Sequence, residues 1–178
     1  MTKDKQAAVS AVAEKAALIG EVADCIWEYA ELSLQEERSA AKYCAVLEAE
    51  GFTVERRICS IPTAFSASYG SGRPVIGLLA EYDALSGMSQ KAGSVEREET
   101  VPGGNGHGCG HNLLGAGAMA AALGVKAWLE QTGNPGTVIL YGCPGEEGGA
   151  AKAFMAREEL WRKLDAALTW HPDDVNDV

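Results

Sequence analysis

Residues 74–83 read PVIGLLAEYD, an unbroken apolar run that ends in acidic side chains. Such a run is typical of a strand covered on both faces, because a half-exposed strand alternates apolar with polar residues. Two later stretches have the same character, TVILYG at 137–142 and AALTW at 166–170. We therefore expect three buried strands that run parallel in one sheet.

Helical patterns lie between these strands, at 111–131 and at 150–164. Buried strands that alternate with helices predict an α/β domain whose mostly parallel sheet is flanked by helices. The length of 178 residues suits one domain, spanning 1–178, with a sizeable core.

The segments upstream of the first buried strand predict two helices and a half-buried strand. Apolar residues at three- and four-residue spacing indicate one long helix over 5–31. Ser33 and Glu36 have the spacing of a capping box that opens a second helix, and Gly51 is a natural stop for it. Apolar and polar residues alternate over 65–69, as in a strand with one exposed face.

Composition excludes several functional classes. The net charge is -10 with no basic cluster, so nucleic acid is not an expected partner. Five scattered cysteines do not suggest a disulfide framework. The N-terminal residues lack the apolar core of a signal peptide, and the apolar run at 113–125 is short for a membrane span. We expect a cytoplasmic protein that does not bind a membrane.

Ionisable side chains follow each of the three apolar strands. Ligands of open α/β sheets bind beyond the carboxyl ends of the strands, so these side chains are expected to meet at one edge. They are Glu81 and Asp83, Glu146 and Glu147, and His171. The aperiodic segment 86–108 leads into NGHGCGHN at 105–112, just before the apolar helix, so this motif can reach the same edge.

The NGHGCGHN motif has three interpretations. Cys109 and His111 flank one glycine, and a thiolate with an imidazole suits zinc or a similar divalent ion. Alternatively, Cys109 is an activated nucleophile near a helix N-terminus, or the motif is a glycine-rich turn with incidental side chains. His107 could also ligate, although support of the loop from outside the ligand set is the preferred role.

The Glu146–Glu147 pair predicts a division of labour. Adjacent side chains of an extended segment point in opposite directions, so one carboxylate can bind metal while the other acts as general base. A solvated acidic turn is the alternative. His171 alone could be structural, and Asp83 could orient a ligating histidine or cap a loop.

Four motifs together, EYDALSG, NGHGCGHNLLG, CPGEEGG and ALTWHP, resemble the metal-dependent aminoacylase/carboxypeptidase family of amidohydrolases. The resemblance implies the first half of a zinc-peptidase-like catalytic domain. It also implies a centre of two divalent ions, zinc or manganese, that activates a water to attack an amide carbonyl.

Residue by residue, the resemblance makes Glu146 the general base and Asp83 the conserved aspartate of the early strand-end motif. Many relatives have a histidine ligand two residues before that aspartate; Glu81 stands there and is not counted as a ligand. The implied metal ligands are Cys109, His111, Glu147 and His171.

The resemblance also implies a missing part. Family members are roughly twice as long, and they continue into a lid and dimerisation domain and a last histidine ligand. Here Val178 follows His171 by seven residues. We therefore expect a partial catalytic domain without that lid, as a truncated product, an expressed fragment, or a chain completed by another subunit.

Three functions remain open. The leading hypothesis is hydrolysis of a small-molecule amide substrate, such as an N-acyl amino acid or a dipeptide-like compound. The second makes Cys109 a nucleophile with His111 as its base. The third is a half-domain that binds metal or a partner without turnover. For the chain alone we expect at most about one tightly bound ion, self-association and little activity, with a homo-oligomer or second subunit supplying the missing half.

Overall fold

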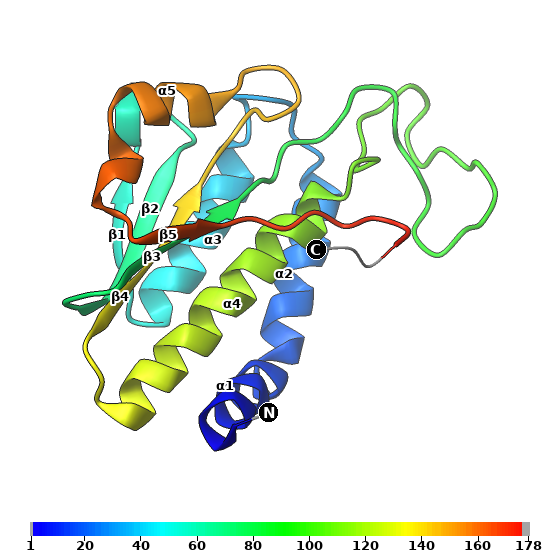
Figure 1. Cartoon of the computed structure of the whole chain (residues 1–178). Helices are drawn as coiled ribbons and strands as arrows, with labels where there is room; N and C mark the ends of the chain where they lie inside the picture. Colours follow the sequence, from blue (N-terminus) through cyan, green and yellow to red (C-terminus); the bar gives the residue numbers. More distant parts are fainter. Residues whose placement is uncertain (1, 176–178) are drawn as a thin grey trace.

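A computed structural model describes residues 2–175. Its strands form one five-stranded sheet, and helices pack against this sheet (Figure 1). The strand order is β1-β2-β4-β3-β5. The strands are β1 (Thr53–Arg56), β2 (Phe65–Ser71), β3 (Val75–Ala80), β4 (Gly136–Gly142) and β5 (Ala166–Leu168).

The three apolar stretches form neighbouring parallel strands, as predicted. β3 pairs in parallel with β4 on one side and with β5 on the other. β1 and β2 are antiparallel additions, since β2 pairs antiparallel with both β1 and β4. The α/β class is thus confirmed, with a mixed sheet.

The predicted burial of the third strand is wrong. All three residues of β5 are exposed. The reason is its position, because β5 is an edge strand that pairs with β3 alone. Leu168 and the following Trp170 are 54% and 43% exposed, so this edge presents apolar surface.

Helices cover the two faces of the sheet unequally. α2 (Ala16–Tyr29), α3 (Glu37–Ala49) and α4 (His111–Thr132) supply the larger core with β2, β3 and β4. On the other face, α5 (Ala151–Arg157) and the short 3-10 helices η1 (Ile58–Ser60) and η2 (Leu160–Lys163) pack around Tyr141 and Met155. The first helix, α1 (Lys3–Glu14), lies against α4.

Two helix predictions need correction. The single helix over 5–31 is divided at Lys15, whose backbone leaves helical geometry, and α1 and α2 meet there at an angle (Figure 1). The second helix begins at Glu37 rather than Ser33. The capping box does not form because Leu34 has a positive φ of 63° and the Glu36 carboxylate bonds elsewhere. Gly51 follows the end of this helix as predicted, with φ 85°.

Helix α4 is the one helix of the described chain that is long and apolar enough to cross a membrane by length and composition. Its most apolar window is 56% buried inside the fold. Leu114, Met119 and Ala122 on its inner side are fully or almost fully buried, as expected of a helix that packs on a sheet.

Gly142 ends β4, with three residues between it and the acidic turn, and the Phe65 ring occupies the space where a side chain would stand. We predict that Gly142→Ala lowers the free energy of unfolding by about 1–3 kcal/mol, because the core is overpacked. Gly20→Ala is the matched control. Gly20 lies within α2 with open space around it, so alanine should stabilise the protein by about 0.5–1 kcal/mol. Urea unfolding of both variants measures the difference, and equal effects would contradict it.

Candidate metal centre

The structure brings the predicted side chains to one edge of the sheet. Asp83 follows β3, Glu146 and Glu147 follow β4, and His171 follows β5. The loop before α4 carries Cys109, and His111 is the first residue of that helix. The carboxyl ends of the three parallel strands therefore meet the N-terminus of α4.

His111 occupies the centre of this group. It is fully buried, and its Nδ1 lies 2.9 Å from Oδ1 of Asp83. Its Nε2 faces carboxylates, 3.1 Å from Oε2 of Glu81 and 3.9 Å from Glu146 and Glu147. Within residues 2–175 this nitrogen has no partner with hydrogen-bond geometry. The ring is oriented through one nitrogen, and the other is directed at oxygen donors, as in metal-ligating histidines.

Asp83, which orients His111 through Nδ1, is itself held in place by two further hydrogen bonds. Its Oδ2 accepts from the Ser33 hydroxyl at 2.7 Å and from the Glu147 backbone N–H at 2.9 Å. Burial alone would raise the pKa of Asp83, but these bonds and that from His111 hold the pKa below its usual value. Burial alone would likewise lower the pKa of His111, but Asp83, Glu81 and Glu147 outweigh it and the pKa is raised.

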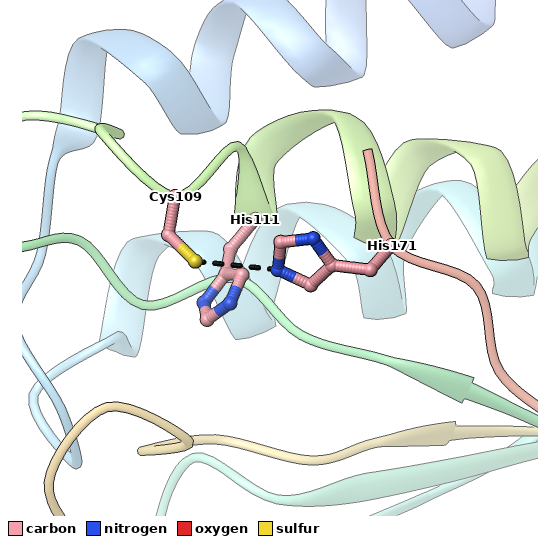
Figure 2. Close-up of side chains that lie close together, drawn as sticks. All are labelled: Cys109, His111 and His171. Carbon is pink, nitrogen blue, oxygen red and sulfur yellow. Dashed lines mark hydrogen bonds between the residues drawn. The ribbon is translucent and has the colours of Figure 1, made fainter. Parts of the chain in front are cut away.

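Cys109 and His171 form the other side of the group (Figure 2). Sγ of Cys109 lies 3.2 Å from Nε2 of His171. Nδ1 of His171 lies 2.8 Å from its neighbour's carbonyl oxygen, so this nitrogen carries the proton and Nε2 is left as a donor atom. The centroids of the His171 and His111 rings are 5.6 Å apart, and the rings are packed edge to face.

The surroundings of Cys109 do not favour the nucleophile hypothesis. Burial first, and then the carboxylates of Glu147, Glu146 and Glu81, raise the pKa of its thiol to about 11. An activated cysteine needs the opposite shift. His111, the expected base, is engaged by Asp83 instead.

The geometry of the Glu146–Glu147 pair differs from the prediction. Residues 146–149 form a turn rather than an extended segment. Both carboxylates therefore converge, each 3.9 Å from Nε2 of His111, instead of pointing in opposite directions. Glu146 is the more accessible, with 44% of its side chain exposed against 21% for Glu147.

Glu81, which was not counted as a ligand from the sequence, belongs to this cluster. Its side chain is 7% exposed and forms an ion pair with Lys152 of α5 through its other oxygen. Among the described residues there are two groups of three side chains whose donor atoms lie within 4.8 Å of one another, and both groups include His111. One is Cys109, His111 and His171, and the other is Glu81, His111 and Glu146.

Three more side chains support the group without joining it. Ser33 and the buried Glu36 contact the ligand-bearing loops, and their spacing gave only the misleading signal of a helix cap. Burial raises the pKa of Glu36, which its hydrogen bonds only partly offset. His107 is turned away, with Nε2 3.0 Å from the Ile26 carbonyl oxygen.

The donor set fits a divalent cation. Thiol, imidazole and carboxylate together suit borderline ions, and the unpartnered Nε2 of His111 is directed at the carboxylates. The fold and this set of donors define an α/β protein with a divalent-metal site at the carboxyl edge of its sheet.

A family model described as Peptidase family M20/M25/M40 matches residues 77–177, the part that holds Glu81 to His171. This match covers more than half of the chain, and the chain belongs to this family.

Curated relatives extend the comparison. The chain is 57% identical over 153 residues to one of the subunits of p-aminobenzoyl-glutamate hydrolase from Escherichia coli (strain K12), a match that covers 86% of this chain and 32% of that protein. It is 30% identical over 185 residues to Xaa-Arg dipeptidase of Mus musculus, covering 97% of this chain and 39% of the relative. The chain thus spans about a third of the length of these relatives.

Solved structures share the fold. An M20-family dinuclear metal-binding peptidase from Bacillus subtilis has a TM-score of 0.67 at 23% identity, covering 88% of this chain and 44% of that one. An aminobenzoyl-glutamate utilization protein from Klebsiella pneumoniae has a TM-score of 0.65 at 14% identity, covering 93% and 46%.

Proposed function

We propose that this site is part of a metal-dependent amide hydrolase. The observation that carries the proposal is the pair of donor groups that share the buried His111, one with a thiol and the other with carboxylates. Because Nδ1 of His111 is bonded to Asp83, its Nε2 can bind one ion, so this cluster provides directly for one ion. The mixture of sulfur, nitrogen and oxygen donors supports zinc or manganese.

The proposed chemistry assigns a task to each residue. A bound divalent ion would supply Lewis acidity toward the amide carbonyl and lower the pKa of a water. Asp83 holds the His111 ring in place through Nδ1. The accessible carboxylate of Glu146 would take the proton of the attacking water and deliver it to the leaving nitrogen. Cys109, His111, Glu147 and His171 would hold the metal.

The substrate we propose is p-aminobenzoyl-glutamate or another small N-acyl amino acid. The support is the 57% identity to a hydrolase of that compound, against 30% to a dipeptidase. A second copy or another subunit would complete the centre. The exposed β5 edge supports such a partner, because an unpaired strand edge with apolar side chains favours association.

A chimera tests the proposed activity. The 153 matched residues of the E. coli protein are replaced by those of this chain, within the native assembly of that protein. We expect hydrolysis of p-aminobenzoyl-glutamate that a chelator abolishes and that zinc or manganese restores. The isolated chain should bind at most about one ion tightly and hydrolyse little. A folded chimera that binds metal but releases no p-aminobenzoate would contradict the proposed function.

A further inference from the structure

We propose that residues 30–36, the strap, set the relative positions of three of the four segments that carry the candidate metal donors, with Ser33 and Glu36 as positioning residues. The proposal rests on the proposed function. The strap connects α2 to α3 and supplies no donor atom to either metal group. It nevertheless contacts three of the four donor-bearing segments, namely the loops after β3 and β4 and the loop before α4. The fourth segment, which carries His171, follows β5.

The first loop, which carries Glu81 and Asp83, is attached to the strap by backbone and side chain. The Ala84 N–H donates to the Glu31 carbonyl at 2.8 Å. Leu32 and Ala84 are the partners of an isolated parallel β-bridge. The Ser33 hydroxyl then donates to Oδ2 of Asp83 at 2.7 Å. The strap thereby fixes the carboxylate that orients His111.

The second loop, the acidic turn after β4, is held by the Glu36 carboxylate. Glu36 is fully buried, and its Oε1 accepts from the Gly145 N–H at 2.8 Å and from the Leu34 N–H at 2.9 Å. Oε2 accepts from the Thr63 hydroxyl at 2.9 Å. The described hydrogen bonds of this carboxylate all join it to other parts of the protein. One of them joins it to Gly145, the residue before Glu146.

Close packing reinforces this attachment. A methyl group on Gly145 or Gly149 would lie 2.9 Å or 2.8 Å from the Leu34 side chain. Gly145 also has a φ of 65°, which a residue with a side chain rarely adopts. The glycines that flank the two glutamates therefore let the strap approach the turn.

The third loop leads to Cys109. The Asn105 amide donates to the carbonyl of Ala30, the first residue of the strap, at 3.1 Å. The strap thus ties these three donor-bearing loops to the same seven residues.

The attachments matter because metal binding tolerates little displacement. Ligand distances in a metal site are held within about 0.2 Å, and loss of a group that orients a ligand lowers metal affinity about 10–100-fold. Asp83 Oδ2 accepts from both Ser33 and the Glu147 N–H, so a moved strap would shift the imidazole and the carboxylates together.

The test compares variants of the chain by Co²⁺ titration, with visible absorption as the signature of coordination and thermal unfolding as the measure of stability. Glu36→Met keeps the bulk but removes the acceptors, and should weaken Co²⁺ binding about tenfold or more and alter the spectrum. Glu36→Gln should restore binding to within about twofold, because its oxygen can accept from Gly145 and Leu34 while its amide donates to the Thr63 hydroxyl.

Thr63→Val is the matched control. It removes a hydrogen bond from the same carboxylate but keeps the backbone carbonyl that accepts from the Tyr82 hydroxyl of the loop after β3, so it should lower the unfolding temperature and leave the Co²⁺ spectrum unchanged. If Glu36→Met does not fold, Ser33→Ala decides, with an expected loss of about tenfold in affinity.

The outcomes separate the two proposals. A wild-type chain that binds no Co²⁺ would defeat the proposed function. Wild-type binding with unchanged binding in Ser33→Ala and Glu36→Met would defeat the strap alone. Weakening in Thr63→Val equal to that in Glu36→Met would also defeat the strap, because it would reduce Glu36 to a contributor to stability.

Discussion

In the chimera, Glu146→Gln is expected to lower the rate of amide hydrolysis at least about a hundredfold while the bound metal is retained. Glutamine is close in size to glutamate but cannot take a proton from water. Glu146 is the more exposed of the two turn glutamates, with 44% of its side chain accessible, as a base that meets solvent should be. The measurement is initial rate together with metal content by mass spectrometry.

Two comparisons make this result specific. Glu96→Gln removes an exposed carboxylate of the loop between β3 and α4 and should change neither quantity. Glu147→Gln should instead reduce metal content, since its neighbourhood includes the Cys109 thiol. Metal loss in Glu146→Gln with metal retained in Glu147→Gln would mean that the two roles are exchanged. That arrangement would agree with the donor group of Glu81, His111 and Glu146.

The second large effect concerns metal affinity. Cys109→Ala should weaken Co²⁺ binding by more than about a hundredfold, because loss of even an orienting partner outside the ligand set costs about 10–100-fold. The sulfur-to-metal absorption band should disappear at the same time. Cys109 is the described cysteine that lies beside His111 and His171, so no other thiol can replace it.

Cys59→Ala is the control for this variant. Cys59 is also partly buried but lies in η1, on the opposite face of the sheet. Its replacement should leave both the affinity and the absorption band unchanged. Retention of the band in Cys109→Ala would show that the thiol is not a ligand.

The sequence predicted the structure best where the pattern of a single segment determines whether that segment forms a buried strand. The apolar runs of β3 and β4 predicted buried parallel strands, and acidic residues at their ends predicted a shared edge. The exposure of β5 was not predictable in the same way, because an apolar strand at a sheet edge has the same sequence as one in the middle.

The errors arise where distant segments meet. Ser33 and Glu36 have the local pattern of a helix cap, yet their partners are Asp83 and Gly145, far along the chain. The divergence expected of Glu146 and Glu147 assumed extended backbone, whereas the glycines allow a tight turn. The resemblance to relatives with a histidine at this position argues against Glu81 as a ligand, and only the fold places it against His111.

The separations along the chain have a consequence for the order of folding. Glu36 and Gly145 are 109 residues apart, Cys109 and His171 are 62 apart, and Ser33 and Asp83 are 50 apart. Contacts between such distant residues close large loops and form late, when most of the chain is already compact. A nascent or partly unfolded chain therefore cannot hold an ion at this edge, and capture of the ion becomes a late, cooperative event. Metal occupancy would then report the integrity of the whole domain, so that even a remote destabilising substitution would be detected as lost metal.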